Sequence, residues 1–268
     1  MTIQRNVKLA LFVGLIGSWT VSASATPVVI DDFSGALNPA YVQSYAFIGT
    51  NAAAITYDTT TNPGSLTYSY SGATSSSQAV QTELLRNDYK LLNDGDWVQV
   101  KASIQVTSAG SSNGTRLFGG IAVGLVGDTD RNDVAAVYLR SDGSLTVQYN
   151  NAGTITADNL VAAGGLFTAI TGPADSIPVW TRLTRASATS LIPAYSTDGI
   201  NFTSGSAVPI VDLAGLGVGV YNGNATTSRT GTVLYDDLTI NVVPEPSAFA
   251  LATLGMIGLQ FVRLKWRK

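Results

Sequence analysis

A ten-residue alternation, from Trp97 to Val106, is the feature of this sequence that most restricts the fold. Its apolar residues occupy every second position, namely Val98, Val100, Ala102, Ile104 and Val106. Successive side chains of a β-strand point to opposite faces, so the pattern predicts a strand with one buried face and one solvated face. Polar Gln99, Lys101, Ser103 and Gln105 would face water, whereas Trp97 and Trp180, which begin two strands, are expected in the core.

The region 26–242 repeats this signal in shorter runs. Val, Ile, Leu, Tyr and Thr alternate with Gly, Ser, Asn and Asp, and turn signals such as Asn62-Pro63-Gly64 and Asp142-Gly143 separate neighbouring runs. No window in this region shows a helical period for more than about two turns. The expected strands are 28–33, 55–58, 65–70, 79–85, 97–106, 118–126, 134–140, 145–149, 180–185, 191–196, 216–221 and 231–240. The pattern predicts an all-β sandwich of two antiparallel sheets.

The N-terminal end has the three parts of a secretory signal peptide. Arg5 and Lys8 supply positive charge, Leu9 to Trp19 form an apolar run of 11 residues, and Ala23-Ser24-Ala25 is a small-residue cleavage site. The apolar run is too short to span a bilayer. We therefore expect residues 1–25 to be removed and residues 26–242 to form one exported domain.

The C-terminal end also has three parts in a fixed order. Pro244-Glu245-Pro246 interrupts regular structure, and residues 247–262 are 16 uncharged, mainly apolar residues. With Leu264 included and Arg263 extended toward the interface, the sequence predicts a transmembrane helix over 247–264. The end is basic and would stay on the cytoplasmic side, through Arg263, Lys265, Arg267 and Lys268.

Residues 243–268 resemble the PEP-CTERM sorting signal of Gram-negative bacteria that make exopolysaccharide. The resemblance implies recognition and cleavage by a membrane-embedded exosortase. It also implies export through the inner membrane, anchoring before processing, and a cell-surface or extracellular location afterwards. A plain single-span anchor behind a proline-rich linker is the alternative.

The stretch from Trp180 to Ile240 resembles concanavalin A-like, laminin-G-like jelly rolls. The resemblance is carried by Trp-Thr-Arg-Leu-Thr-Arg at 180–185, Tyr-Ser-Thr-Asp-Gly-Ile-Asn-Phe at 195–202, and the closing runs 217–221 and 235–238. Phe202 replaces the usual Trp, and Ile192-Pro193 interrupts a strand, which suggests an edge or a bulge. The resemblance implies a jelly roll whose first and last strands pair.

Charge and composition exclude several classes of function. The region 26–242 holds 9 of the 15 basic residues and 17 of the 18 acidic ones, which gives a net charge of −8. Such a body is not expected to bind nucleic acid or an anionic membrane surface. Cys and His are absent from the chain, so disulfides, the commonest general base and the commonest transition-metal ligand are absent too.

Two acidic clusters are candidate calcium sites, because hard cations prefer oxygen ligands. One is a loop with oxygen-bearing side chains at Asp128, Asp130, Asn132 and Asp133. The other would form if the terminal strands pair, from Asp31, Asp32, Asp236 and Asp237. The alternative is that the loop is a solvated turn and that the paired acids face solvent or cap loops.

Binding fits the sequence better than catalysis does. Tyr57, Tyr68 and Tyr70 are a weak candidate platform for stacking on sugar rings. Glu83 is the only Glu in the region 26–242 and is expected to be an exposed strand residue or an Arg partner, so the carboxylate pair of a glycosidase is not evident. We expect a non-enzymatic surface or matrix protein that binds polysaccharide. A concanavalin-like hydrolase or lyase and a purely structural biofilm component are the alternatives.

Overall fold

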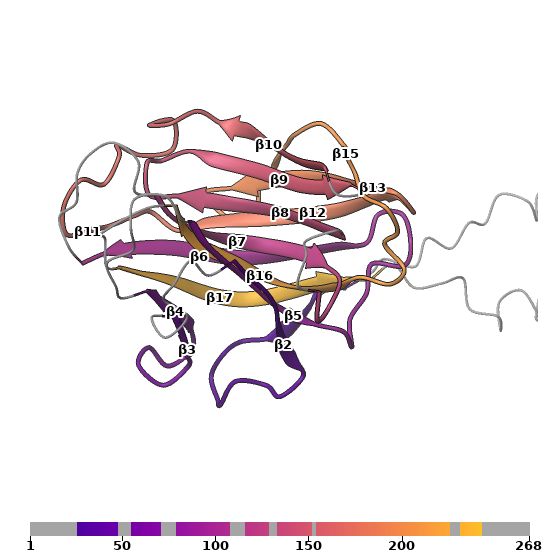
Figure 1. Cartoon of the computed structure of the whole chain (residues 1–268), viewed down its shortest axis with the longest axis horizontal. Coiled ribbons are helices and arrows are strands. Elements are labelled where there is room, and N and C mark those ends of the chain that lie inside the picture. The colour runs from indigo at the N-terminus through magenta and orange to yellow at the C-terminus, as the bar shows by residue number, and fades with distance from the viewer. Residues whose placement is uncertain are drawn as a thin grey trace, which may run out of the picture. The chain divides into compact units, whose positions relative to one another are not determined.

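The computed structural model describes residues 26–47, 55–70, 79–107, 116–128, 133–151, 154–225 and 231–242. The predicted signal peptide (1–25) and the sorting segment (243–268), with its predicted helix 247–264, lie outside this part of the chain. Within the described ranges, no helix is long and apolar enough to cross a membrane. The regular elements described there are β-strands, which Figure 1 shows as two overlying layers with nearly aligned long strands.

Sheet A contains the long predicted alternation near its centre. Its strands follow the order β14-β13-β12-β6-β17-β4-β3, with β1 beside β17, β11 beside β6 and β15 beside β13. Their bounds are β1 Val28–Asp31, β3 Ile55–Asp58, β4 Leu66–Tyr70, β6 Trp97–Val106, β11 Ala174–Asp175, β12 Val179–Ser187, β13 Ser190–Ser196, β14 Thr203–Ser204, β15 Val208–Pro209 and β17 Gly231–Asn241.

Sheet B is a path of seven described strands in the order β10-β9-β8-β7-β16-β5-β2. Their bounds are β2 Tyr41–Phe47, β5 Ala79–Arg86, β7 Arg116–Gly124, β8 Asp133–Arg140, β9 Leu145–Asn151, β10 Thr154–Val161 and β16 Gly217–Ala225. All pairings in both sheets are antiparallel. The architecture confirms the predicted two-sheet jelly-roll sandwich.

The main core lies between the two sheets and follows the alternation in β6. Every second residue of β6 is buried, from Val98 to Val106, while the residues between them are half-buried. Val98, Val100 and Ile104 have no exposed surface and pack against inward residues of sheet B such as Ile121 and Val220. Burying apolar surface on both inner faces is the main stabilising contribution to a sandwich of this kind.

Strand β7 is buried on both faces, as its uninterrupted apolar character predicts. Gly119 permits a close approach between the sheets, because a Cβ at this position would lie 2.2 Å from the hydroxyl oxygen of Tyr235. The Tyr235 hydroxyl donates to the backbone oxygen of Tyr221, at 3.0 Å, and to the side-chain oxygen of Asn222. Sheet A is therefore joined to sheet B by hydrogen bonds as well as by apolar packing.

The first and last described strands pair, as the family resemblance implies. Val28 lies opposite Ile240 and Asp31 lies opposite Leu238. Pro193 lies inside β13, between the residues that pair with β15 (190–191) and those that pair with β14 (194–195). Its backbone oxygen accepts a hydrogen bond from the N–H of Gly205 at 2.8 Å, and the proline has no N–H to return one, as is tolerated where a sheet ends in short edge strands.

A truncation in the core tests the importance of β6. Replacing Ile104, which has no exposed surface, with Ala should lower the free energy of unfolding by about 2–5 kcal/mol, since buried atoms are lost and a cavity forms. Ile200→Ala is the matched control, because Ile200 is 81% exposed and its truncation should change stability by less than about 0.5 kcal/mol. Chemical denaturation followed by circular dichroism measures both. Equal losses for the two variants would contradict the assigned core.

Candidate functional site

Two tryptophans lie on the outer face of sheet A, so the expectation that they belong to the core is wrong. Trp97 and Trp180 are both only partly buried. In β6 the inward positions are 98, 100, 102, 104 and 106, and Trp97 therefore faces outward with Gln99 and Lys101. In β12, Trp180 lies opposite Lys101, on the same outer face.

Arg182 is held between two aromatic rings on this outer face. Its guanidinium carbon lies 4.1 Å from the ring centre of Trp97 and 3.5 Å from that of Phe202. Its Nε and Nη2 both donate to the side-chain oxygen of Gln99, at 3.0 and 2.5 Å. A guanidinium in contact with two aromatic rings and fixed at one edge keeps a defined orientation.

Lys101 forms a second contact between a cation and an aromatic ring beside the first. Its Nζ lies 5.5 Å from the ring centre of Trp180 and donates to Asp236 Oδ2 at 2.9 Å. The exposed fractions of the Lys101 and Asp236 side chains are 32% and 35%. This pair is accessible to water, and pairs of this kind contribute little to stability.

A tight loop after β13 covers one side of Trp180. Gly199 has φ of 75°, and a Cβ there would lie 3.0 Å from the indole ring, so a residue without a side chain is required. The carboxylate of Asp198 accepts hydrogen bonds from the backbone N–H groups of Ile200 and Asn201, both at 2.8 Å. These bonds hold the loop in place, and Ile200 within it is exposed.

We refer to this region as the sheet A face. It combines flat rings, two cations and an amide on the central strands β6 and β12 and on the adjoining loop, and consists of Trp97, Gln99, Lys101, Trp180, Arg182 and Phe202. The alternation of β6 could have placed Trp97 correctly, because odd-numbered positions such as 99 and 101 face outward. Trp97 was instead predicted in the core because it is a large aromatic residue.

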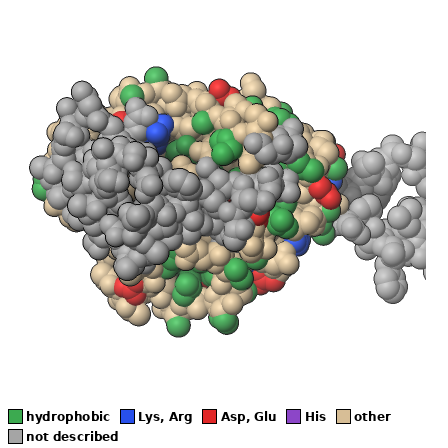
Figure 2. All heavy atoms as spheres, in the orientation of Figure 1, with side chains coloured by type: hydrophobic (Ala, Val, Ile, Leu, Met, Phe, Trp, Pro, Cys, Tyr) green, Lys and Arg blue, Asp and Glu red, His purple; other side chains and the backbone are tan. Residues whose placement is uncertain are grey.

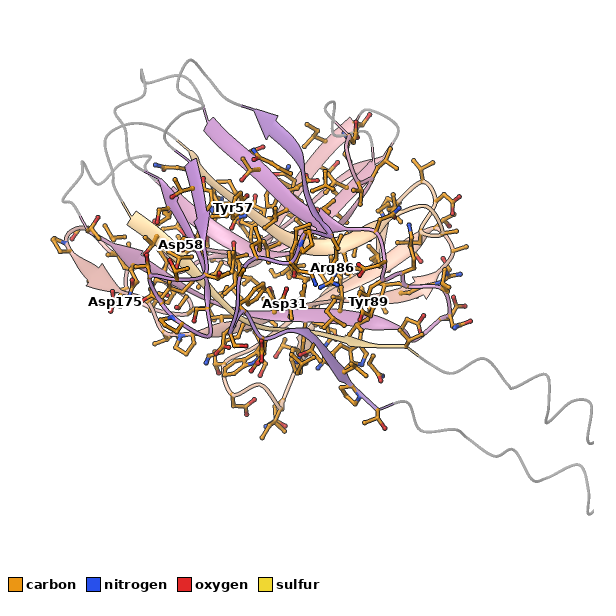
Figure 3. The ribbon with its side chains drawn as sticks, turned by 90° about the horizontal axis from the view of Figure 1, so that it is seen from below. Asp31, Tyr57, Asp58, Arg86, Tyr89 and Asp175 are labelled. Carbon is orange, nitrogen blue, oxygen red and sulfur yellow. The ribbon has the colours of Figure 1, made fainter. Side chains whose placement is uncertain are left out.

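The predicted acidic cluster at the terminal strands does come together in part, but Arg86 occupies its centre. The Arg86 side chain is 4% exposed and lies 3.7 Å from Asp31 Oδ2. Its Nε and Nη2 donate to the two carboxylate oxygens of Asp88, at 2.8 and 2.7 Å, and its Nη1 donates to the backbone oxygen of Ile30. Figure 3 shows Asp31, Arg86 and Tyr89 near one another, with the guanidinium carbon 4.9 Å from the Tyr89 ring centre.

The other acids of this corner have partners of their own. Asp32 accepts hydrogen bonds from the N–H and the hydroxyl of Ser34, and Asp236 pairs with Lys101. Burial raises the pKa of Asp237, and the charge of Asp236 raises it further. In the described part of the chain, no group of three or more acidic side chains is arranged to hold a metal ion. Calcium binding at this corner therefore stays a prediction, since the described residues do not form a ready set of ligands there.

The second predicted calcium site is mostly outside the described residues. Asp130 and Asn132 lie in the range 129–132, which is outside the described residues. Asp133, at the start of β8, is described only through its backbone. Asp128 is described: its N–H donates to the backbone oxygen of Leu125 at 3.2 Å, in a turn with Gly127 at φ of 83°. The calcium hypothesis for this loop stays untested.

Of the three tyrosines predicted to stack on sugars, Tyr68 belongs to the core and Tyr57 is half-buried and packs against it. Tyr68 has no exposed surface, and its ring centre lies 5.6 Å from that of Tyr57. Tyr57 donates to, or accepts from, the hydroxyl of Thr82 at 2.6 Å, so it points toward sheet B. The predicted platform is therefore wrong for Tyr68, because a sugar ring needs an accessible aromatic face. The side chain of Tyr70 lies outside the described residues.

The outer face of sheet B carries a small buried cluster that the prediction missed. Tyr138 donates to the side-chain oxygen of Gln148, whose amide nitrogen donates to the Tyr221 hydroxyl, each at 3.2 Å. The rings of Phe118, Tyr138 and Tyr221 pack with centres 4.8 to 5.6 Å apart. Glu83, which was expected to be an exposed strand residue or an Arg partner, is 2% exposed in the same sheet, so the first of these alternatives is wrong. This buried cluster offers a ligand less access than the sheet A face does.

A family model described as the PEP-CTERM protein-sorting motif matches residues 242–268. The match includes Pro244, Glu245 and Pro246 and the basic residues at the end of the chain, and it confirms the sorting signal predicted from the sequence. It covers the C-terminal segment and leaves the body of the chain unassigned. No curated protein matches the chain.

Several solved structures are similar in fold. Lectin II from Ulex europaeus is 13% identical, with a TM-score of 0.44, over 82% of this chain and 98% of the lectin. A functionally unknown protein from Saccharomyces cerevisiae is 15% identical, with a TM-score of 0.43, over 72% of this chain and 93% of that protein. A family 7 alginate lyase is 16% identical, with a TM-score of 0.40, over 74% of this chain and 85% of the lyase.

The loop over Trp180 should respond to acid through Asp198. Hydrogen bonds, first from the N–H of Asn201, hold the pKa of Asp198 well below its ordinary value of 3.8. Because the pKa of Asp198 is lowered, its carboxylate stabilises the loop at pH values above the ordinary pKa of 3.8. This contribution is lost as the pH falls from there through the lowered pKa. Tryptophan fluorescence should therefore be constant from neutral pH to about pH 5 and change only below about pH 4. A Trp180→Phe variant should lack this change; a transition centred above pH 5 would contradict the assignment.

Proposed function

We propose that this protein is exported, processed by an exosortase at its C-terminal signal, and acts without catalysis as a polysaccharide-binding component of the cell surface or extracellular matrix. The match at residues 242–268 supports the destination. The sheet A face supports the binding, because it is the described surface where several aromatic rings and hydrogen-bonding groups are accessible together.

The chemistry of that face suits sugars. Sugar rings bind to proteins through apolar contact with aromatic side chains and through hydrogen bonds to hydroxyl groups. Trp97 and Phe202 supply the rings, and Gln99, Lys101 and Arg182 supply the polar groups. All members of the face except Phe202 lie on two central strands of a sheet, so their side chains are positioned by rigid ladders, and Phe202 joins them from the adjoining loop.

The acidic character of the body limits the range of partners. In Figure 2, acidic side chains are distributed over the visible surface among uncharged atoms, and basic side chains are few. A net charge of −8 over 26–242 disfavours nucleic acid, which binds mainly through neutralised phosphates. An extended polysaccharide can instead bind through local contacts on one face.

A glycan array with the full-length protein in mild detergent tests the binding. Phe202→Ala should weaken binding about 2- to 10-fold, because an aromatic contact of about 0.5–1.5 kcal/mol is lost. Ile155→Ala is the control, since Ile155 is exposed on β10 of the other sheet and its loss should leave binding unchanged. Absence of binding to any glycan would remove the proposal and favour a purely structural component. Release of reducing sugar or unsaturated product from a bound glycan would overturn the non-enzymatic assignment.

Processing is tested by changing the motif itself. Replacing Pro244, Glu245 and Pro246 with Ala should leave the C-terminal segment attached and the protein in the membrane fraction, because the processing enzyme would no longer recognise it. Pro209→Ala, in an exposed position of the body, is the control and should be processed normally. Cell fractionation and mass spectrometry of the C-terminus measure the outcome. Normal release of the triple variant would show that the prolines are only part of a linker.

A further inference from the structure

Arg182 differs from Arg86, Arg185 and Lys101 in its electrostatic environment. Arg86 pairs with Asp88 at 2.7 Å, Arg185 with Asp94 at 3.1 Å, and Lys101 with Asp236 at 2.9 Å. In the described part of the chain, Arg182 takes part in no ion pair. Its neighbours are two aromatic rings and a neutral amide.

An unpaired guanidinium in such a position has an energetic cost. Burial lowers the pKa of Arg182 to about 10, which means that the surroundings disfavour its charge. The rings of Trp97 and Phe202 offset part of this cost, and Gln99 accepts two hydrogen bonds. A carboxylate that reached the guanidinium from outside would supply the missing opposite charge.

One edge of the guanidinium remains available for such a group. The Nε–Nη2 edge faces the oxygen of Gln99. Within the described residues, Nη1 makes no hydrogen bond. A carboxylate can accept two parallel hydrogen bonds from the Nη1 and Nη2 groups, and this geometry is specific to arginine. The two rings restrict the guanidinium to one plane, so less rotamer freedom is lost when a ligand binds.

We propose, building on the polysaccharide-binding function above, that the ligand of the sheet A face is an acidic polysaccharide and that Arg182 binds the carboxylate of a uronic-acid residue. Trp97 and Phe202 line the position of that residue. Gln99 keeps the guanidinium aligned and does not itself contact the carboxylate. The net charge of −8 over 26–242 repels polyanions in general, an acidic polysaccharide included. Recognition therefore depends on the fixed geometry of Arg182, the cation of the face that has no acidic partner in the described part of the chain, rather than on a broad basic surface.

The test compares two forms of one polymer. Polygalacturonate and its fully methyl-esterified form share a backbone, but only the first carries free carboxylates. Calorimetric titration of the full-length protein in mild detergent should give affinity about tenfold higher for the free acid, as expected for one charge-assisted pair. Raising NaCl to about 0.5 M should reduce that difference, because the charge interaction is screened.

Variants at two arginines of β12 show whether the preference for the free acid depends on Arg182. Arg182→Gln should remove the preference for the free acid, and Arg182→Lys should retain only part of it, since the charge stays but the forked geometry is lost. Arg185→Gln is the matched control, because Arg185 lies on the same strand and already pairs with Asp94. It should leave the preference unchanged. Melting curves of all three variants establish that they are folded.

The possible results separate this inference from the function on which it rests. Equal affinity for both polymers, or a preference that survives in folded Arg182→Gln, would overturn the role of Arg182 while glycan binding itself stands. Binding to the esterified or to a neutral glycan alone would overturn it as well. Failure of the wild-type protein to bind any glycan would remove both proposals.

Discussion

The regular alternation of β6 determines most of this structure. β6 pairs with β12 on one side and with β17 on the other, so its inward residues anchor the core while its register positions both neighbours. The same constraint produces the outer face. When Val98 and Val100 point inward, Trp97, Gln99 and Lys101 must point outward, and the ladder to β12 brings Arg182 opposite Gln99. Core and candidate site are thus two faces of one strand.

Arg86 and Arg182 differ in how their charge is balanced. Arg86 is buried, bonds with both oxygens of Asp88 and approaches Asp31, and it thereby joins β5 of sheet B to β1 of sheet A. Removing one partner of such an arrangement would leave a buried charge without compensation, so the group contributes to holding the fold together. Arg182 has no such partner and lies where a ligand can reach it. Two arginines of one domain therefore have opposite relationships to solvent and to stability.

The sequence predicted the central strands well and the sheet edges poorly. The bounds of β6 agree with the predicted 97–106, and the hairpins and the pairing of β1 with β17 were also expected. The strands β2 and β10 were missed, and they are the two edges of sheet B. An edge strand has fewer buried neighbours: every residue of β10 is exposed or only half-buried, so its sequence Thr-Ile-Thr-Ala-Asp-Asn-Leu-Val shows no apolar alternation.

The site was harder to predict because it depends on pairs that are distant in sequence. Residues 97 and 182 meet only through the register of two strands, and Phe202 joins them from a loop. Composition drew attention to tyrosines instead, although Tyr68 fills the core. The sorting signal was recognisable because its three parts are contiguous and need no tertiary structure to be identified.

The position of β17 has a consequence for how the protein reaches its folded state during export. β17 is the last strand described, yet it lies inside sheet A, between β6 and both β4 and β1. Sheet A can therefore close only after residues 231–241 have left the translocation channel, when nearly all of the body is already outside. The strand that completes the sheet directly precedes the segment matched by the sorting motif. Completion of the fold and arrival of the sorting signal at the membrane thus fall at nearly the same stage of export.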